Sequence, residues 1–236
     1  RSSPPFIFSI CCMLFSFVHN SIHLFGFNGE PSQVIIRFES RKSSNYTTDK
    51  MIAVNQPVIE AQAPHPAKEN LKTIYLAGGC FWGMQSYFDG VQGVVETTVG
   101  YANSTRPNPK YEDVDTDYAE TIRVEYDASV VPLKFILGLY FDVIDPTILN
   151  RQGNDVGRQY RTGIYYTNAQ DEVVAKEMLQ TLAKKYPKPI VVECIPLKNF
   201  YPAEAYHQDY LKKHPSGYCH IGKDKIARAH AQRYVD

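Results

Sequence analysis

Residues 73–90 read TIYLAGGCFWGMQSYFDG, and this segment decides how the fold begins. Its first five residues are mainly β-branched, aromatic or apolar, which is typical of a buried strand that two glycines then end. Beyond the glycines, apolar side chains recur at spacings that suit one face of a short helix ending at Gly90. Cys80 is therefore expected on the first helical turn, in a tight bend between strand and helix.

This position bears on the chemistry of Cys80. At the first turn of a helix, unpaired backbone N–H groups and the helix dipole favour the thiolate, which is the nucleophilic form of cysteine. Cysteine is also among the residue types most often buried in a core. The segment alone therefore leaves two interpretations open, a reactive thiol and a buried structural one.

The composition of the whole chain excludes some classes of protein. Lys plus Arg and Asp plus Glu both number 25 in 236 residues, so no net charge favours binding to nucleic acid or to an anionic membrane. The five cysteines are odd in number and irregularly spaced, unlike the disulfide framework of a small secreted protein. With 17 tyrosines, hydroxyl donors are plentiful.

The composition also divides the chain into two parts. Residues 1–70 are interpreted as a leader with an apolar run at 6–18, followed by a polar, flexible linker. Residues 71–236 are expected to form one domain. We expect a cytoplasmic protein; the alternative is the secretory pathway or an organelle, to which residues 6–18 would direct the chain.

Periodicity predicts the elements that follow residue 90. The predicted strands cover 94–99, 121–126, 162–166 and 189–195, and the predicted helices cover 133–141, 167–182 and 203–213. Residues 100–109 and 145–161 are predicted to be irregular, and long irregular stretches in a compact domain are usually functional. Strands and helices mixed without strict βαβ repetition predict an α+β fold, a two-layer sandwich with a mixed sheet, flanking helices, long irregular catalytic loops and a mobile C-terminal tail.

Two chemistries could use Cys80 without Cys219, and a zinc site that does not include Cys80 is also conceivable. A thioredoxin-like pair needs a second cysteine three positions on, where Gly83 stands. A cysteine hydrolase would pair Cys80 with His207 or His214 as base. A zinc site is the third possibility, although no C-x2-C pair exists; its ligands would be Cys194, Cys219, His207 and His220.

A fourth chemistry joins two distant thiols. Cys80 would become a sulfenic acid, and Cys219, on a tail with glycine and proline hinges, would attack it to form a disulfide. From the residues alone, this redox cycle and the hydrolase both remain open.

Five blocks of sequence decide among these alternatives by resemblance. They are residues 79–83, 107–111, 119–120, 151–161 and 205–211. In content and order they resemble the type A peptide methionine sulfoxide reductases, and the likeness covers residues 73–222. The resemblance implies thiol-dependent reduction of the S epimer of methionine sulfoxide, free or in oxidised proteins, and hence protein repair under oxidative stress.

The resemblance also implies roles for particular residues. Cys80 matches the nucleophile, and Cys219 matches the cysteine that resolves its sulfenic acid. Phe81 and Trp82 match an apolar wall that receives the methyl group of the substrate. Asp155 matches a carboxylate that orders the site. The implied reductant is thioredoxin or dithiothreitol, with no metal or organic cofactor, in a monomer that binds no nucleic acid.

The sulfoxide oxygen needs a proton donor, and the resemblance assigns this task to Glu120, Tyr111 and Tyr160. A carboxylic acid with a pKa near ~4.3 would be ionised at neutral pH and could not donate. We therefore expect burial among aromatic rings to raise the pKa of Glu120 and keep it protonated. The two phenol hydroxyls would then share the developing charge.

The sequence departs from the family pattern at three positions. Tyr118 stands where histidine is usual, Gln85 where glutamate is common, and Arg158 where threonine is frequent. We expect Tyr118 to alter the hydrogen bonding of Glu120 and the other two to matter less. The role of Cys194 is left open.

Overall fold

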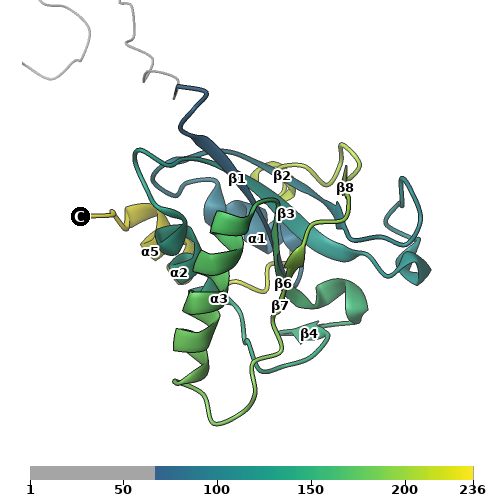
Figure 1. Ribbon diagram of the computed structural model, residues 1–236. Helices are drawn as coiled ribbons and strands as arrows, with labels where there is room; N and C mark the ends of the chain where they lie inside the picture. Colours follow the sequence, from purple (N-terminus) through teal and green to yellow (C-terminus); the bar gives the residue numbers. More distant parts are fainter. Residues whose placement is uncertain (1–66, 236) are drawn as a thin grey trace, which may run out of the picture. The chain divides into compact units, whose positions relative to one another are not determined.

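A six-stranded mixed sheet forms the centre of the computed structural model, which describes residues 67–235 (Figure 1). Its strand order is β7-β6-β1-β3-β2-β8, and its strands are β1 (Leu71–Gly78), β2 (Val94–Ala102), β3 (Ala119–Asp127), β6 (Thr162–Tyr166), β7 (Glu193–Pro196) and β8 (Phe200–Pro202). Only the β6–β7 pair of this sheet is parallel. The predicted leader and most of the linker, residues 1–66, lie outside the described residues.

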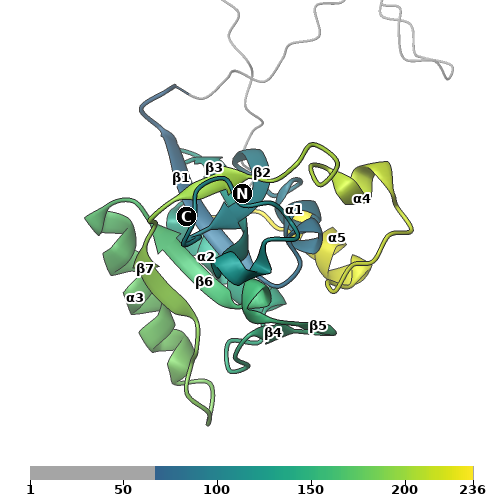
Figure 2. The same cartoon turned by 90° about the vertical axis from the view of Figure 1, so that its right-hand side faces the viewer.

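Helices cover one face of this sheet. They are α1 (Phe81–Phe88), α2 (Leu133–Val143), α3 (Ala169–Ala183), α4 (Tyr210–Lys213) and α5 (Lys223–Ala231). Figure 2 shows α3 beside β6 and β7, with α4 and α5 on the far side of the molecule. None of the helices between residues 67 and 235 has both the length and the apolar character needed to cross a bilayer.

The core forms because alternate strand residues face these helices. Ile74 and Leu76 of β1 are fully buried against Met84 and Phe88 of α1 and Ile136 of α2. A smaller cluster occupies the opposite face of the sheet. The predicted two-layer α+β architecture with a mixed sheet is confirmed.

The predicted helix at 203–213 is wrong over most of its length. Only Tyr210–Lys213 is helical, and Asp209 has a left-handed φ of 53°. The side chain of Gln208 explains the difference, because it accepts a hydrogen bond from Val99 N and donates one to Val99 O. This amide pairs with the backbone at the edge of β2, and residues 205–209 before α4 form turns, with His207 N donating to Glu204 O.

Other element boundaries also differ from the prediction. Helix α3 starts after Asn168, whose side chain accepts a hydrogen bond from Asp171 N, so the predicted helix start at 167 is two residues early. Strand β7 is shorter than the predicted 189–195. Residues 145–161 contain a hairpin, β4 (Arg151–Gln152) with β5 (Asp155–Val156), then a 3-10 turn at Arg158–Tyr160. The Gly153-Asn154 pair between those strands was a readable turn signal.

The C-terminal tail contains a helix that the sequence analysis missed. Helix α5 packs on α1 and buries Ala229, although most of its side chains are charged or polar. His230 Nε2 lies 3.1 Å from Ser86 O and 3.2 Å from Tyr87 O, near the end of α1. The tail is thus docked on the helix that carries the site, and its mobility stays a prediction.

Candidate active site

Cys80 lies where the sequence analysis expected it, at the start of α1. Gly79 makes the turn with a φ of 85°, and a Cβ there would lie 2.6 Å from Gln152 Cβ, so the bend requires glycine. The thiol is buried, with an exposure of 6%. The backbone N–H groups of Trp82 and Gly83 hydrogen-bond to its sulfur.

The ionisation of Cys80 differs from the expectation for a helix N-terminus. The two N–H groups lower its pKa, as expected, but burial raises it and so does the nearby charge of Glu120. The net pKa of the thiol is raised. The prediction of a favoured thiolate is therefore wrong for the resting site, because desolvation outweighs the helix terminus.

Glu120 is the carboxyl group next to this thiol. It comes from the start of β3, has an exposure of 2%, and accepts a hydrogen bond of 3.0 Å from Phe81 N through Oε2. Burial raises its pKa to about 8; the charge of Asp155 adds to this, and the Phe81 N–H opposes it. The predicted rise in pKa is confirmed, and Glu120 is mostly protonated at neutral pH.

Strand register explains why Glu120 and Cys80 meet. Ala77 of β1 pairs with Thr121 of β3, so Glu120 lies one residue beyond the pair, at the end of β1. Because β1 ends in the glycine turn, the side chain of Glu120 reaches the first turn of α1. Chain positions 39 apart are thereby brought into hydrogen-bond contact.

Tyr111 and Tyr160 form a second pair of donors beside Glu120. The two hydroxyls interact through a side-chain hydrogen bond. Burial first, and then the charge of Glu120, raises the pKa of both phenols, so both are neutral donors. Tyr111 remains 39% exposed, so this residue lies at the surface of the protein.

Three residues hold Tyr111 in place, and the sequence analysis missed this arrangement. The Tyr118 hydroxyl donates to Tyr111 O at 2.6 Å, and Tyr111 N donates to Glu204 Oε1 at 3.3 Å. Tyr101 donates to the other oxygen of Glu204 at 2.7 Å. The hydroxyl of Tyr118 is thus used on Tyr111, and the expected change in hydrogen bonding to Glu120 is not seen.

An aromatic cluster forms the wall next to Cys80. Phe81 is 1% exposed, and the half-buried indole of Trp82 stacks on Tyr210 with ring centroids 3.8 Å apart. Trp82 Nε1 donates to His207 Nδ1 at 3.0 Å, which fixes the indole. His207 Nε2 must then carry the proton of the neutral ring, so neither nitrogen is free to act as a base.

This geometry removes two of the alternatives. His207 is engaged with Trp82, and His214 is exposed and packs against Tyr210, so neither serves Cys80 as a hydrolase base. Within residues 67–235 no group of three or more His, Cys, Asp and Glu side chains is arranged to hold a metal ion. The zinc interpretation is therefore wrong for the described part of the chain.

The C-terminal segment closes over the site. Asp155 accepts a hydrogen bond of 3.0 Å from the Tyr218 hydroxyl, which anchors the residue before Cys219. Cys219 is half-buried and unbonded to another cysteine, and its Sγ donates to Ile221 O at 3.1 Å. A Cβ placed on Gly83 would lie 3.2 Å from that sulfur. Cys219 therefore rests on the first turn of α1, the turn that Cys80 begins.

The other departures lie outside this cluster. Gln85 Oε1 accepts from Asp209 N at 2.8 Å, which ties α1 to the segment before α4. Arg158 forms a bidentate ion pair with Asp117 on the surface.

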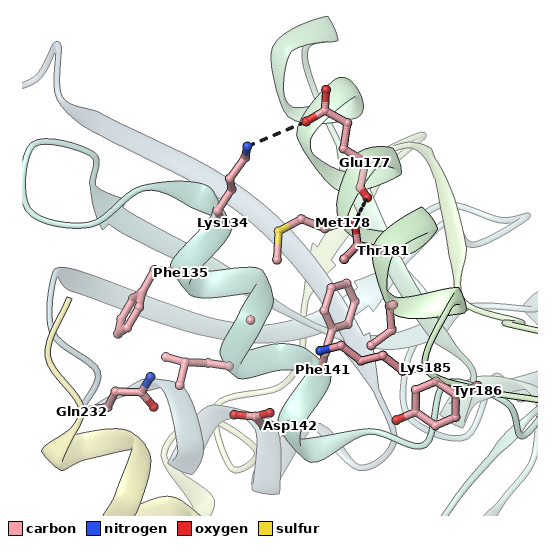
Figure 3. Close-up of a pocket in the computed structure, with 13 residues that line it drawn as sticks. Lys134, Phe135, Phe141, Asp142, Glu177, Met178, Thr181, Lys185, Tyr186 and Gln232 are labelled. Atoms are coloured by element: carbon pink, nitrogen blue, oxygen red, sulfur yellow. Dashed lines mark hydrogen bonds and ion pairs between the residues drawn. The ribbon is translucent and has the colours of Figure 1, made fainter. Parts of the chain in front are cut away.

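A groove between α2 and α3, lined by Phe141, Met178 and other side chains, contains none of the predicted site residues (Figure 3).

The eight predicted residues lie together at one site, which is centred on the Cys80 thiol. They are Cys80, Phe81, Trp82, Tyr111, Glu120, Asp155, Tyr160 and Cys219. The arrangement offers a nucleophile, a neutral acid, two hydroxyl donors, an aromatic wall and a second thiol within reach of the same helical turn. Such a set suits transfer of an oxygen atom to sulfur.

Comparison with known proteins agrees with this chemistry. The peptide methionine sulfoxide reductase family model matches residues 72–235. The peptide methionine sulfoxide reductase MsrA of Lachnoclostridium phytofermentans is 56% identical over 155 residues, 64% of this chain and 93% of that protein. The protein of the same name from Mycoplasma pneumoniae is 53% identical over 157 residues, 65% of this chain and 100% of that protein.

Solved structures give the same result. Methionine sulfoxide reductase A of Corynebacterium diphtheriae has a TM-score of 0.62 and 34% identity, covering 66% of this chain and 88% of that one. Reduced Mxr1 of Saccharomyces cerevisiae has a TM-score of 0.60 and 35% identity, covering 66% of this chain and 92% of that one.

Proposed function

The chain belongs to the peptide methionine sulfoxide reductase family, and we propose that it reduces the S epimer of methionine sulfoxide, free or in oxidised proteins, to methionine. One observation carries this proposal within the site: a carboxyl group with a pKa of about 8 is buried beside a cysteine at a helix start. A neutral acid next to a sulfur nucleophile is what reduction of a sulfoxide requires.

The first step transfers oxygen between sulfurs. Glu120 and the hydroxyls of Tyr111 and Tyr160 donate to the sulfoxide oxygen, while Trp82 contacts the methyl group. Because Glu120 is mostly neutral at pH 7, little of its charge remains to raise the pKa of Cys80, and the Trp82 and Gly83 N–H groups stabilise the negative charge on the attacking sulfur. Cys80 attacks the substrate sulfur, and its thiol proton replaces the one that Glu120 gives to the oxygen. The bond between the substrate sulfur and the oxygen then breaks, the oxygen passes to Cys80 as a sulfenic acid, and methionine leaves.

The second step resets Cys80 through Cys219. The Cys219 sulfur attacks the sulfenic acid, a Cys80–Cys219 disulfide forms, and water leaves. The resting place of Cys219 on the first turn of α1 supports this pairing. Thioredoxin, or dithiothreitol in the test tube, then reduces the disulfide by thiol exchange. The cycle uses no metal or organic cofactor.

Reduction of a peptide that contains methionine sulfoxide tests the proposal. With dithiothreitol, we expect the wild type to turn over the S epimer and leave the R epimer, and Cys80→Ser to be inactive. With thioredoxin as the only reductant, Cys219→Ser should release one equivalent of methionine and then stop. Ester hydrolysis without any sulfoxide reduction would overturn the proposal in favour of a cysteine hydrolase.

A further inference from the structure

His220 is a half-buried titratable residue that the two steps above do not use. It follows Cys219, and its Nε2 lies 3.1 Å from Gly78 O, at the end of β1. A backbone carbonyl can only accept, so Nε2 carries the ring proton. Nδ1 of the neutral ring is therefore left with a free lone pair.

This nitrogen lies against the helical turn that Cys80 begins and on which Cys219 rests. His220 Nδ1 is buried and has no hydrogen-bond partner among the described residues. A Cβ placed on Gly83 would lie 3.0 Å from His220 Nδ1 and 3.2 Å from Cys219 Sγ. The Gly83 N–H in turn hydrogen-bonds to the sulfur of Cys80. A basic nitrogen thus shares one helical turn with both reacting sulfurs.

The surroundings keep this nitrogen available at neutral pH. Burial lowers the pKa of His220, and the charge of Lys225 on α5 lowers it further. The charge of Asp155 on β5 raises it. The net shift favours the neutral ring, which can accept a proton. Cys219, by contrast, has a pKa raised by burial, so its thiol needs a base before it can attack.

We propose that His220 is the base of the disulfide step, an inference that rests on the function proposed above. Nδ1 takes the proton from the Cys219 thiol as Cys219 leaves Ile221 O and its sulfur bonds to that of Cys80. The S–O bond of the sulfenic acid breaks at the same time. The departing hydroxide takes the proton from the imidazolium, so one water leaves and His220 returns to its neutral form.

His220→Gln provides the test, because the glutamine amide can still donate to Gly78 O but has no basic lone pair. His214→Gln, on the exposed surface, is the matched control. Both variants and the wild type would be mixed with one equivalent of sulfoxide peptide, without reductant, from pH 5 to pH 9. Methionine release and Cys80–Cys219 disulfide formation are then followed separately by quenched mass spectrometry.

We expect His220→Gln to release methionine at the wild-type rate and to form the disulfide about 100-fold more slowly at pH 7, with the sulfenic acid accumulating. The disulfide rate of the wild type should level off above the imidazole pKa. That of the variant should keep rising, about tenfold per pH unit, because hydroxide must replace the lost base. His214→Gln should match the wild type.

Two results would overturn the role of His220. One is a variant disulfide rate with the wild-type size and pH profile; the other is an equal loss in both steps, which would mean a structural role. Undiminished methionine release also shows that the variant is folded, and His220→Asn repeats the test if His220→Gln does not fold. Wild-type enzyme that releases methionine without forming the disulfide would instead overturn the second step proposed above.

Discussion

The carboxyl group of Glu120 meets two opposing demands. Burial at 2% exposure makes it a neutral acid at pH 7, as proton donation to a sulfoxide oxygen requires. The same burial makes its ionised form costly, since among residues 67–235 the Phe81 N–H is the one group with a hydrogen bond to this carboxyl group. The pKa of about 8 is the balance of burial, which raises it, and the Phe81 N–H, which lowers it.

The pH dependence of the first step should report this pKa. We expect single-turnover methionine release by the wild type to fall above about pH 8, as Glu120 loses its proton. Glu120→Gln should keep much of the rate, because the amide still donates a hydrogen bond, and should lack this fall. Glu120→Ala should lose about 100-fold or more. Equal rates for the Gln and Ala variants would remove Glu120 from the mechanism.

Tyr118 gives a second prediction at the scale of one residue. Tyr118→Phe removes the 2.6 Å hydrogen bond to Tyr111 O and so loosens the loop that carries Tyr111. We expect methionine release to slow about fivefold, which corresponds to the ~1 kcal/mol of a neutral hydrogen bond. Tyr206→Phe, at a side chain with 58% exposure, is the control. An unchanged rate for Tyr118→Phe would mean that the loop is held without this bond.

At the scale of elements, the C-terminal tail packs closely on helix α1 because Gly83 of this helix has no side chain. Gly83 lies on the helix surface that Cys219 and His220 cover, and neither would leave room for a Cβ without moving. A glycine within a short helix is unfavourable by about 1 kcal/mol relative to alanine. The close approach of the tail gives a physical reason for it.

Gly83→Ala should therefore separate the two chemical steps. We expect methionine release near the wild-type rate, and disulfide formation slowed by about tenfold or more because Cys219 is displaced. Gly138→Ala on α2 is the matched control, since a Cβ there would meet nothing within 4 Å. That control should raise the free energy of unfolding by about 0.5–1 kcal/mol and leave both steps unchanged. Normal disulfide formation in Gly83→Ala would show that the tail adapts freely.

At the scale of the whole molecule, the site depends on contacts between distant segments. Glu120 lies in β3, between β1 and β2 near the middle of the sheet order, so its ionisation is linked to global unfolding. Its folded pKa of about 8 exceeds the ordinary glutamate pKa of 4.5. The stabilisation from the neutral carboxyl is therefore fully present below about pH 4.5 and is lost as the pH rises to about 8.

This linkage predicts a pH-dependent gain from Glu120→Gln. Relative to the wild type, the free energy of unfolding of the variant should increase by up to about 1.4 kcal/mol per pH unit between about pH 4.5 and pH 8, and then level off. Urea unfolding of both proteins at a series of pH values measures it. A constant difference across that range would contradict the raised pKa.

Local pattern in the sequence predicted the elements whose residues are near neighbours along the chain. The bend from β1 into α1, the strands near 94, 121 and 162, and helix α2 follow from side-chain spacing and glycine positions, because hydrophobic period and turn chemistry are local properties. The family resemblance supplied the candidate residues of the site, since separated motifs need no knowledge of their contacts.

Only the tertiary structure decided what depends on pairing between distant residues. The register of β1 with β3 brought Glu120 to the thiol, and the burial that follows raised the pKa of Cys80 where local reasoning lowered it. The hydrogen bonds between Gln208 and Val99 of β2 kept residues 203–209 out of a helix. The mostly polar tail forms helix α5, which packs on α1. Burial and non-local hydrogen bonds are properties of the assembled chain, and the spacing of residues along it does not record them.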